Sequence, residues 1–160
     1  MSLEGQQLGR YRLQQRLGSG GMGEVYLATD TIINRQVAIK IIRTELALHL
    51  KAGESSNQTR LFQREMRAIS QLDHPNILPL FDYGEEIVGN ASTAYLVMPY
   101  RPEGSLAQWI AQRGGMGTLS TQDIVHIIVQ AAQALQHAHE HTIIHQDVKP
   151  ANFLLRDLTF

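Results

Sequence analysis

Hydrophobic and polar residues alternate in several short stretches of the first hundred positions, and this period of two is typical of β-strands. Tyr11, Leu13 and Leu17 follow this spacing, and a similar alternation begins again at Val25. We expect strands near residues 11–17, 24–30, 36–43, 78–83 and 94–99. The pair Gly89-Asn90 predicts the tip of the last hairpin.

Helical spacing replaces the alternation in other parts of the chain. Within residues 61–72, Leu61, Glu65, Ile69 and Leu72 recur at steps of four, four and three, which predicts one buried helix face. Residues 44–60 are expected to be a long lead into this helix, and we assign them no function. A short helix is predicted over 106–112 and a mobile linker over 114–117. Residues 120–123 are typical of a helix cap, and the long helix after them should bury Ile124, Ile127, Ile128, Ala131, Leu135 and Ala138.

Glycines at positions 18, 20 and 23 lie between the first two predicted strands, so they should form a hairpin tip. Glycine permits positive φ, and without a Cβ atom its N–H group can approach an anion closely. The same spacing also occurs in dinucleotide-binding proteins, but there the last glycine begins a helix. Here a strand is predicted after Gly23. A nucleotide-phosphate loop and a glycine-rich turn without a ligand remain open.

The run at residues 37–42 contains one lysine among β-branched and small side chains. Alternation predicts one face with Ala38, Lys40 and Ile42 and another with Val37, Ile39 and Ile41. An ammonium beside apolar side chains is costly unless an anion lies near it. Lys40 should therefore meet a carboxylate or a phosphate, unless it lies on an edge strand and points into water.

Glu65 is the candidate carboxylate, because its spacing places it on the predicted buried face of its helix. We therefore predict an ion pair between Lys40 and Glu65. The alternative is that Glu65 pairs on the surface with Arg64 or Arg67.

Residues 143–155 place polar side chains between two short apolar runs. Asp147 can accept a proton from a hydroxyl group, and Lys149 can neutralise a phosphoryl group in transfer. Asn152 can offer its carbonyl oxygen to a hard cation such as Mg²⁺. Because Asp, Lys-Pro and Asn also favour turns, an ordinary surface turn is the alternative.

These motifs occur in the order of the protein-kinase signature set: Gly18-x-Gly20-x-x-Gly23-x-Val25, Val37-Ala38-Ile39-Lys40, Glu65, and His145-x-Asp147-x-Lys149-x-x-Asn152. From about Tyr11 to Leu155 the chain resembles a eukaryotic-like Ser/Thr protein kinase of the bacterial type. The resemblance implies an α+β, protein-kinase-like two-lobe fold, in which a small five-stranded antiparallel sheet plus one helix precedes an incomplete, mainly helical large lobe. The small lobe would span residues 1–98, the hinge 99–104, and the start of the large lobe 105–160.

The resemblance also implies a role for each matching residue. Asp147 would be the catalytic base, Lys149 would touch the γ-phosphate, and Asn152 would bind Mg²⁺. The ATP-binding set would comprise Leu17, Gly18, Gly20, Gly23, Val25, Ala38, Lys40, Glu65, Met98, Tyr100 and Leu154. The implied activity is transfer of the γ-phosphoryl group of Mg-ATP to a Ser or Thr hydroxyl of a protein substrate, as in signalling kinases.

Two features depart from the family pattern. Gln146 stands where most members have Arg, so control by a phosphorylated activation loop is not expected. The sequence also stops at Phe160, before the Asp-Phe-Gly segment that the resemblance implies. We therefore expect residues 1–160 alone to be catalytically silent. The alternative function is a pseudokinase or a nucleotide-responsive interaction module.

Composition narrows the class of protein further. The 160 residues have a formal net charge of −1 and no cysteine, which excludes a basic nucleic-acid or membrane footprint, a disulfide framework and a thiolate zinc site. His137 and His141 lie one helical turn apart, but no H-E-x-x-H motif supports zinc there. We expect no membrane segment within this chain and a cytoplasmic location, with a possible membrane anchor beyond Phe160. The oligomeric state is not predicted.

Overall fold

The computed structural model describes residues 3–20, 23–42, 55–88, 91–115, 117 and 119–156. They belong to two units, of which the first comprises Met1–Ser70 and Pro79–Tyr100 and the second Gln71–Leu78 and Arg101–Phe160. The first unit thus differs from the predicted small lobe at 1–98, since it leaves out residues 71–78 and continues to residue 100.

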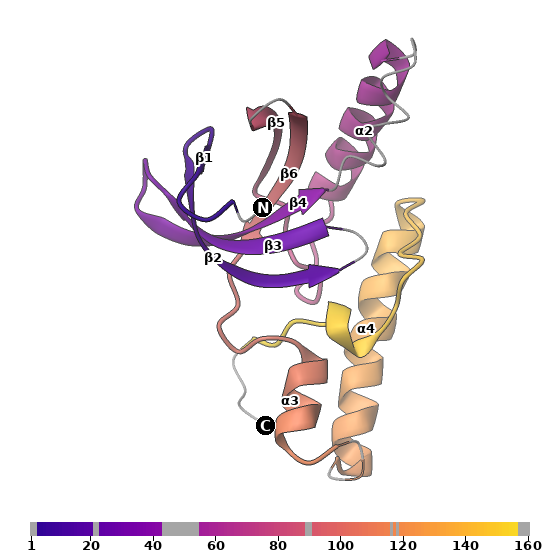
Figure 1. The fold of residues 1–160 in the computed structure, drawn as a ribbon. Helices are drawn as coiled ribbons and strands as arrows, with labels where there is room; N and C mark the ends of the chain where they lie inside the picture. The colour runs from indigo at the N-terminus through magenta and orange to yellow at the C-terminus, as the bar shows by residue number, and fades with distance from the viewer. Residues whose placement is uncertain are drawn as a thin grey trace. The chain divides into compact units, whose positions relative to one another are not determined.

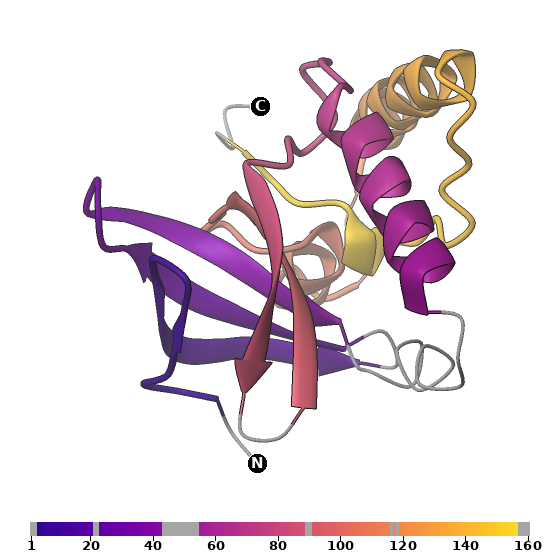
Figure 2. The ribbon, with the colours of Figure 1, turned by 90° about the horizontal axis from the view of Figure 1, so that it is seen from above.

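A twisted antiparallel sheet forms most of the first unit (Figures 1 and 2). Its strands are β1 (Gln7–Leu8), β2 (Tyr11–Gly20), β3 (Gly23–Asp30), β4 (Arg35–Ile42), β5 (Asp82–Val88) and β6 (Ala91–Pro99). Their order in the sheet is β1-β2-β3-β4-β6-β5, and every neighbouring pair is antiparallel.

The sheet differs from the prediction at two places. It has six strands and not five, because the two-residue strand β1 pairs with β2 and is too short to show a period. Strand β5 begins at Asp82 and not near residue 78, since Pro79 has no N–H group to donate to a ladder. The pairing of β5 with β6 ends at Val88 and Ala91, and the predicted tip at Gly89-Asn90 lies outside the described residues.

Alternation along β4 determines which side chains enter the core. Val37, Ile39 and Ile41 are buried on one face, as predicted. Their neighbours in the core include Tyr26 of β3 and Val97 of β6, which pair with Ile39 from either side. Each fully buried aliphatic side chain contributes roughly 1.5 to 3 kcal/mol to folding. The opposite face of β4 remains available for Ala38 and Lys40.

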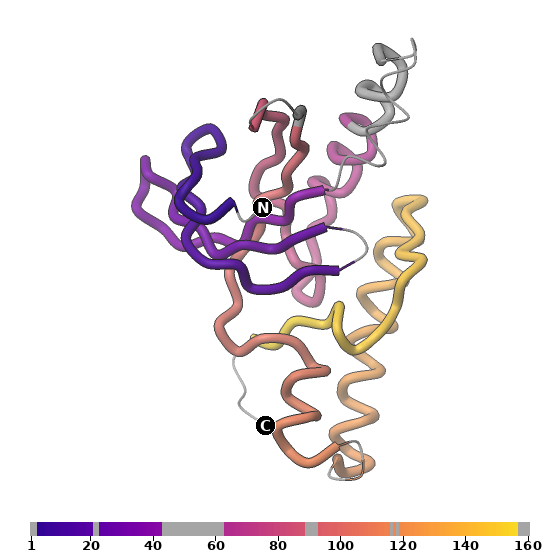
Figure 3. Tube along the Cα trace, in the orientation of Figure 1, coloured from indigo at the N-terminus to yellow at the C-terminus, as the bar shows by residue number. Residues whose placement is uncertain are grey.

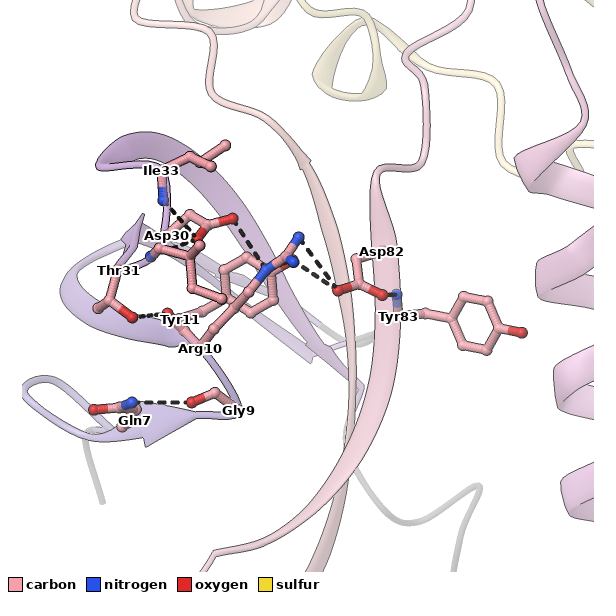
Figure 4. A network of polar contacts seen from close by, with 10 residues as sticks. Gln7, Gly9, Arg10, Tyr11, Asp30, Thr31, Ile33, Asp82 and Tyr83 are labelled. Carbon is pink, nitrogen blue, oxygen red and sulfur yellow. Dashed lines mark hydrogen bonds and ion pairs between the residues drawn. The ribbon is translucent and has the colours of Figure 1, made fainter.

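A polar network links β2, β3 and β5 (Figure 4). Arg10 Nε lies 3.1 Å from an oxygen of Asp30, a carboxylate that is only 2% exposed and that needs this counter-charge. The Tyr11 hydroxyl donates a 2.7 Å hydrogen bond to Asp82 Oδ2. Burial, followed by the bond to Asp82, raises the pKa of Tyr11 to about 12, so the phenol keeps the proton that it donates. The network thereby ties the start of β2 to β5.

Helix α2 (Ser55–Ser70) begins six residues before the predicted start at residue 61. No Gly or Pro occurs after Gly53 until the helix ends, so nothing interrupts its backbone hydrogen bonds. Met66 is the buried residue of its last turns, whereas Glu65 is exposed. The prediction that Glu65 faces inward is therefore wrong. The spacing correctly indicated a helix, but Met66 and not Glu65 is the buried residue.

The second unit contains α3 (Leu106–Gln112), α4 (Thr121–Glu140) and the 3-10 turn η2 (Pro150–Asn152). Both α-helices of this unit begin with a reciprocal capping box, Ser105 with Gln108 in α3 and Ser120 with Asp123 in α4. The predicted helix at 106–112 and the predicted cap at 120–123 are thus confirmed. After η2 the chain returns to the start of α3 (Figure 3). The hydrophobic core of the second unit consists of the buried Leu106, Trp109 and Ile110 and the partly buried Leu119, Ile127, Phe153 and Leu155.

The apolar face of α4 is only partly covered. Ala138 is buried, and Ile124, Ile127, Ala131 and Leu135 are half-buried, but Ile128 is 60% exposed. The exposed Val125 lies three residues before Ile128 and four before the exposed Val129, so these side chains lie on one side of the helix. The prediction that Ile128 is buried is wrong for the residues that the structure describes. None of the described helices is both long enough and apolar enough to span a bilayer.

The ends of α3 and α4 use the same backbone motif with different residues. Beyond α3, Gly114 has φ +91° and Gly115 N donates to Ile110 O. Beyond α4, Thr142 has φ +61° and Ile143 N donates to Ala138 O. Glycine suits this left-handed position, whereas a β-branched side chain is strained there.

Replacing Thr142 by glycine should therefore stabilise the protein by about 1 kcal/mol, because the left-handed conformation costs an L-residue roughly that amount. Urea denaturation of wild type, Thr142→Gly and Thr142→Ala measures the effect. Thr142→Ala keeps the Cβ atom and should gain little, and Gly114→Ala should lose a similar amount at the matching position of α3. Equal stability of the glycine and alanine variants at 142 would disprove the strain.

Candidate active site

The three glycines lie where β2 turns into β3. The hairpin pairs Gly18 with Val25 and Gly20 with Gly23, while residues 21 and 22 are not described. Gly23 alone of the three has positive φ, +127°, and a Cβ atom built on Gly18 or Gly20 would meet nothing within 4 Å. Because a strand follows Gly23, the dinucleotide-binding alternative does not apply. The hairpin leaves its backbone approachable from outside.

The sheet register gathers most of the predicted residues of this unit on one face. Lys40 lies opposite Val25 on β3 and Leu96 on β6, and Ala38 lies opposite Met98. Directly opposed residues of antiparallel strands share a face. Val25, Ala38, Lys40 and Met98 therefore lie together on the face away from the buried core.

Lys40 meets no counter-charge from the part of the chain that the structure describes. It is half-buried, and no carboxylate of the described residues lies within ion-pair distance of it. The predicted pair with Glu65 is absent, and Glu65 is exposed. An ammonium among Val25, Ala38 and Leu96 without a partner is suited to receive an anion.

The three predicted catalytic side chains of the second unit meet at one carboxylate oxygen. Lys149 Nζ lies 2.8 Å from Asp147 Oδ2, and Asn152 Nδ2 donates to the same oxygen at 3.0 Å. Asn152 Nδ2 also donates to the backbone oxygen of Asp147 at 2.8 Å. The turn η2, which begins at Pro150, brings Asn152 back toward Asp147.

The backbone before Asp147 is tightly bent. Asp147 N donates to His145 O at 2.9 Å, and Gln146 between them has φ +62°. The ring of His145 also accepts a hydrogen bond from Asp147 N, at 3.3 Å. His145 thus shapes the loop and holds the backbone of Asp147, as a structural residue would.

Lys149 and Asn152 affect the pKa of the Asp147 carboxyl group. The hydrogen bond from Lys149, and after it the one from Asn152, lower the pKa of the Asp147 carboxyl below its ordinary value. The group is therefore ionised at neutral pH. Oδ2 receives both bonds, and Oδ1 receives none from the residues that the structure describes. One oxygen of a fixed carboxylate remains able to accept a proton.

The other predicted residues differ in exposure. Leu17 and Leu154 are exposed apolar side chains, at 39% and 42%, and Tyr100 is half-buried. Sequence reasoning missed Leu96, which lies beside Lys40 on the same face. The alternation of residues 94–99 could have found it, because Ala94, Leu96 and Met98 share one side of that strand.

Three histidine rings of the second unit lie close together near the end of α4. The rings of His74 and His137 lie 5.3 Å apart, and those of His137 and His141 lie 4.5 Å apart. Within the described ranges, no group of three or more His, Asp or Glu side chains is arranged to hold a metal ion.

Comparisons with known proteins agree with this geometry. A family model described as the protein kinase domain matches residues 11–159. The chain is 39% identical over 147 residues to the serine/threonine-protein kinase PrkC of Bacillus subtilis, covering 92% of this chain and 21% of that protein. It is 39% identical over 146 residues to the serine/threonine-protein kinase PknB of Mycolicibacterium smegmatis, covering 91% of this chain and 22% of that protein.

Solved structures show the same similarity. A double mutant of the PknI kinase domain from Mycobacterium tuberculosis has a TM-score of 0.80 at 30% identity, covering 98% of this chain and 58% of that one. The chain spans about a fifth of the length of the two curated relatives, at 21% and 22%.

Removing the charge of Lys149 should raise the pKa of Asp147 toward its ordinary value, because the bond from Lys149 is the largest cause of the lowering. The folded-state pKa lies below the unfolded-state value, so Asp147 stabilises the fold above the ordinary pKa of an aspartate. This stabilisation is lost as the pH falls through the lowered value. A ¹³C NMR titration of the carboxyl group in Lys149→Met should show the rise. Lys149→Arg, the matched control, should keep the pKa low, and a titration unchanged by Lys149→Met would contradict the assignment.

Proposed function

The chain belongs to the protein kinase domain family, in its bacterial Ser/Thr branch, and on this basis we propose that the protein transfers the γ-phosphoryl group of Mg-ATP to a Ser or Thr hydroxyl of a protein substrate. The family implies the use of ATP, typically with Mg²⁺. The observation that supports the proposal most is the meeting of Asp147, Lys149 and Asn152 at one carboxylate oxygen.

The first unit provides residues that suit the phosphates of a nucleotide. Lys40 is half-buried without a described carboxylate partner, so a phosphate would compensate its charge. The hairpin with Gly18, Gly20 and Gly23 can present backbone N–H groups to the same anion. Val25 and Ala38 share the face of Lys40 and would contact the adenine. We assign Leu17, Met98, Tyr100 and Leu154 to the binding of the base as well.

Asp147 acts on the substrate hydroxyl in this proposal. Oδ2 is fixed by Lys149 and Asn152, which leaves Oδ1 to accept the proton as the hydroxyl oxygen bonds to the γ-phosphorus. The bond from that phosphorus to the β-phosphate oxygen breaks, and ADP leaves. Lys149, 2.8 Å from Asp147, can stabilise the charge of the transferring group.

Asn152 suits a magnesium ligand. Its Nδ2 atom is engaged by Asp147, which leaves its carbonyl oxygen free to face a hard cation. Bound Mg²⁺ would neutralise the negative charge of the phosphates. In this proposal Asp147 accepts the proton of the hydroxyl group, whereas Asn152 would bind Mg²⁺.

One observation keeps the alternative of a pseudokinase, or of a nucleotide-responsive interaction module, in consideration. Lys40 and Glu65 form no ion pair in the structure, and the family uses that pair to place the lysine. We favour the enzyme, because the catalytic loop holds all of its predicted side chains in contact. We also propose a cytoplasmic location for the catalytic unit, where ATP is supplied.

Asp147→Asn should reduce phosphoryl transfer by at least about a hundredfold, since an amide cannot take the hydroxyl proton that a general base accepts. ATP binding should change by less than about twofold, because Asp147 serves the hydroxyl and not the nucleotide. Transfer is measured with radiolabelled ATP and a generic protein substrate, and ATP binding by calorimetric titration. Both experiments use the protein as its natural gene encodes it.

Asp82→Asn is the control for this experiment. It changes an aspartate of the Tyr11 network in the first unit and should leave transfer within about twofold of wild type, provided that the protein remains folded. Equal rates for Asp147→Asn and wild type would refute the role of Asp147. ATP binding without any transfer by wild type would favour the pseudokinase.

A further inference from the structure

Residues 3–8 form a strap beside β2. The last two of them are β1, which pairs with β2. Two backbone hydrogen bonds of 2.9 Å join the strap to Leu13. Leu8 is fully buried, and Leu3 packs against the same hydrophobic core. The strap is therefore held in place before any ligand binds.

Strand β2 is irregular shortly before its glycines. Its pairing with β3 shifts register twice, between Leu13 and Gln15 and again between Arg16 and Gly18. A shift of this kind leaves a residue out of the ladder and allows the strand to bend. Residues 14–20 are exposed, so packing in the core does not hold them. The end of β2 can therefore move relative to the rest of the sheet.

Glu4 of the strap holds the backbone of β2 between these two shifts. Arg16 N donates a 2.9 Å hydrogen bond to Glu4 Oε1. A bond to a carboxylate is stronger than one to a neutral acceptor. Glu4 thus fixes the chain two residues before Gly18, at the base of the segment that can bend.

The strap also reaches β3, through Tyr26. Leu3 N donates to the Tyr26 hydroxyl at 3.2 Å, and this hydroxyl donates to Glu24 Oε2 at 2.8 Å. The other oxygen of Glu24 lies 3.6 Å from Arg16 Nη1. Glu24 directly follows Gly23 in the sequence. These contacts connect the strap to both strands of the hairpin, within two residues of the glycines.

We propose that Glu4 is a positioning residue for nucleotide binding, which acts by holding the glycine hairpin, the part of β2 and β3 that contains Gly18, Gly20 and Gly23. The proposal rests on the phosphotransfer function above. Backbone N–H groups bind a phosphate well only where they converge, and ordering a mobile hairpin on binding costs conformational entropy. The strap lowers this cost, because the base of the hairpin is already fixed. Glu4 acts through Arg16 N and has no contact with the nucleotide in this proposal.

Steady-state kinetics separates positioning from a general structural role. Glu4→Ala should raise the KM for ATP about fivefold and leave kcat at saturating ATP within about twofold, because bound ATP orders the hairpin. Glu4→Gln keeps a carbonyl oxygen that can accept from Arg16 N, so its KM should lie within about twofold of wild type. The matched control is Gln7→Ala, which removes a strap side chain that donates to Gly9 O and should leave KM unchanged. All variants are made in the protein as its natural gene encodes it.

Hydrogen–deuterium exchange without ATP tests the same role without turnover. The amides of residues 14–20 should exchange about fivefold faster in Glu4→Ala than in wild type, Glu4→Gln or Gln7→Ala. The amides of β4 should exchange at the wild-type rate in all four proteins. Because Glu4 is exposed, the unfolding temperature of Glu4→Ala should change by less than about 2 °C.

Three results would overturn the proposal. They are wild-type exchange of residues 14–20 in Glu4→Ala, an equal rise of KM in Glu4→Gln and Glu4→Ala, and faster exchange throughout the sheet, which would mean that Glu4 only supports the fold. A wild type that transfers no phosphoryl group would count against the proposed function. The exchange of residues 14–20 would still decide the role of Glu4 in holding the hairpin.

Discussion

The pairing of β4 between β3 and β6 is the constraint on which the first unit depends. In this register Ile39 lies between Tyr26 and Val97 in the core, and Lys40 lies between Val25 and Leu96 on the other face. A slip of one residue would exchange the two faces and bury the ammonium in the apolar core. The stability of the sheet and the placement of its candidate phosphate-binding lysine thus follow from the same backbone hydrogen bonds.

A smaller backbone ladder has the same importance in the second unit. The bonds of Leu155 N to Gly104 O and of Leu106 N to Phe153 O hold the start of α3 against the segment after the catalytic loop. On one side of this ladder Asp147 is neutralised by Lys149, and on the other Glu103 is not neutralised by any described residue. The two acids of this unit thus differ in whether the described residues compensate them.

The sequence predicted those elements whose signal is local and repeated. The faces of β4, the hairpin at Gly23 and both capping boxes follow from alternation, glycine spacing and cap residues. The predictions from the sequence were wrong where tertiary packing determines which strands form and which side chains are buried. The two-residue β1 exists only through its partner strand, and the spacing around Glu65 could not show that Met66 is the buried residue. Residue types alone named Asp147, Lys149 and Asn152, but not which oxygen they share, and the shielded oxygen of Glu103 depends on burial, which has no local signature.

The central claim is that Lys40, which pairs with no carboxylate among the described residues, binds the phosphate of a nucleotide. Calorimetric titration with Mg-ATP, comparing wild type with Lys40→Met and with Arg12→Met, tests this most directly. Arg12 is an exposed cation on β2 and controls for the loss of one positive charge. We expect Lys40→Met to weaken ATP binding about tenfold or more, since a charge-assisted hydrogen bond contributes roughly 1.5 to 3 kcal/mol, while Arg12→Met remains close to wild type. Unchanged affinity in Lys40→Met, or an equal loss in both variants, would contradict the claim.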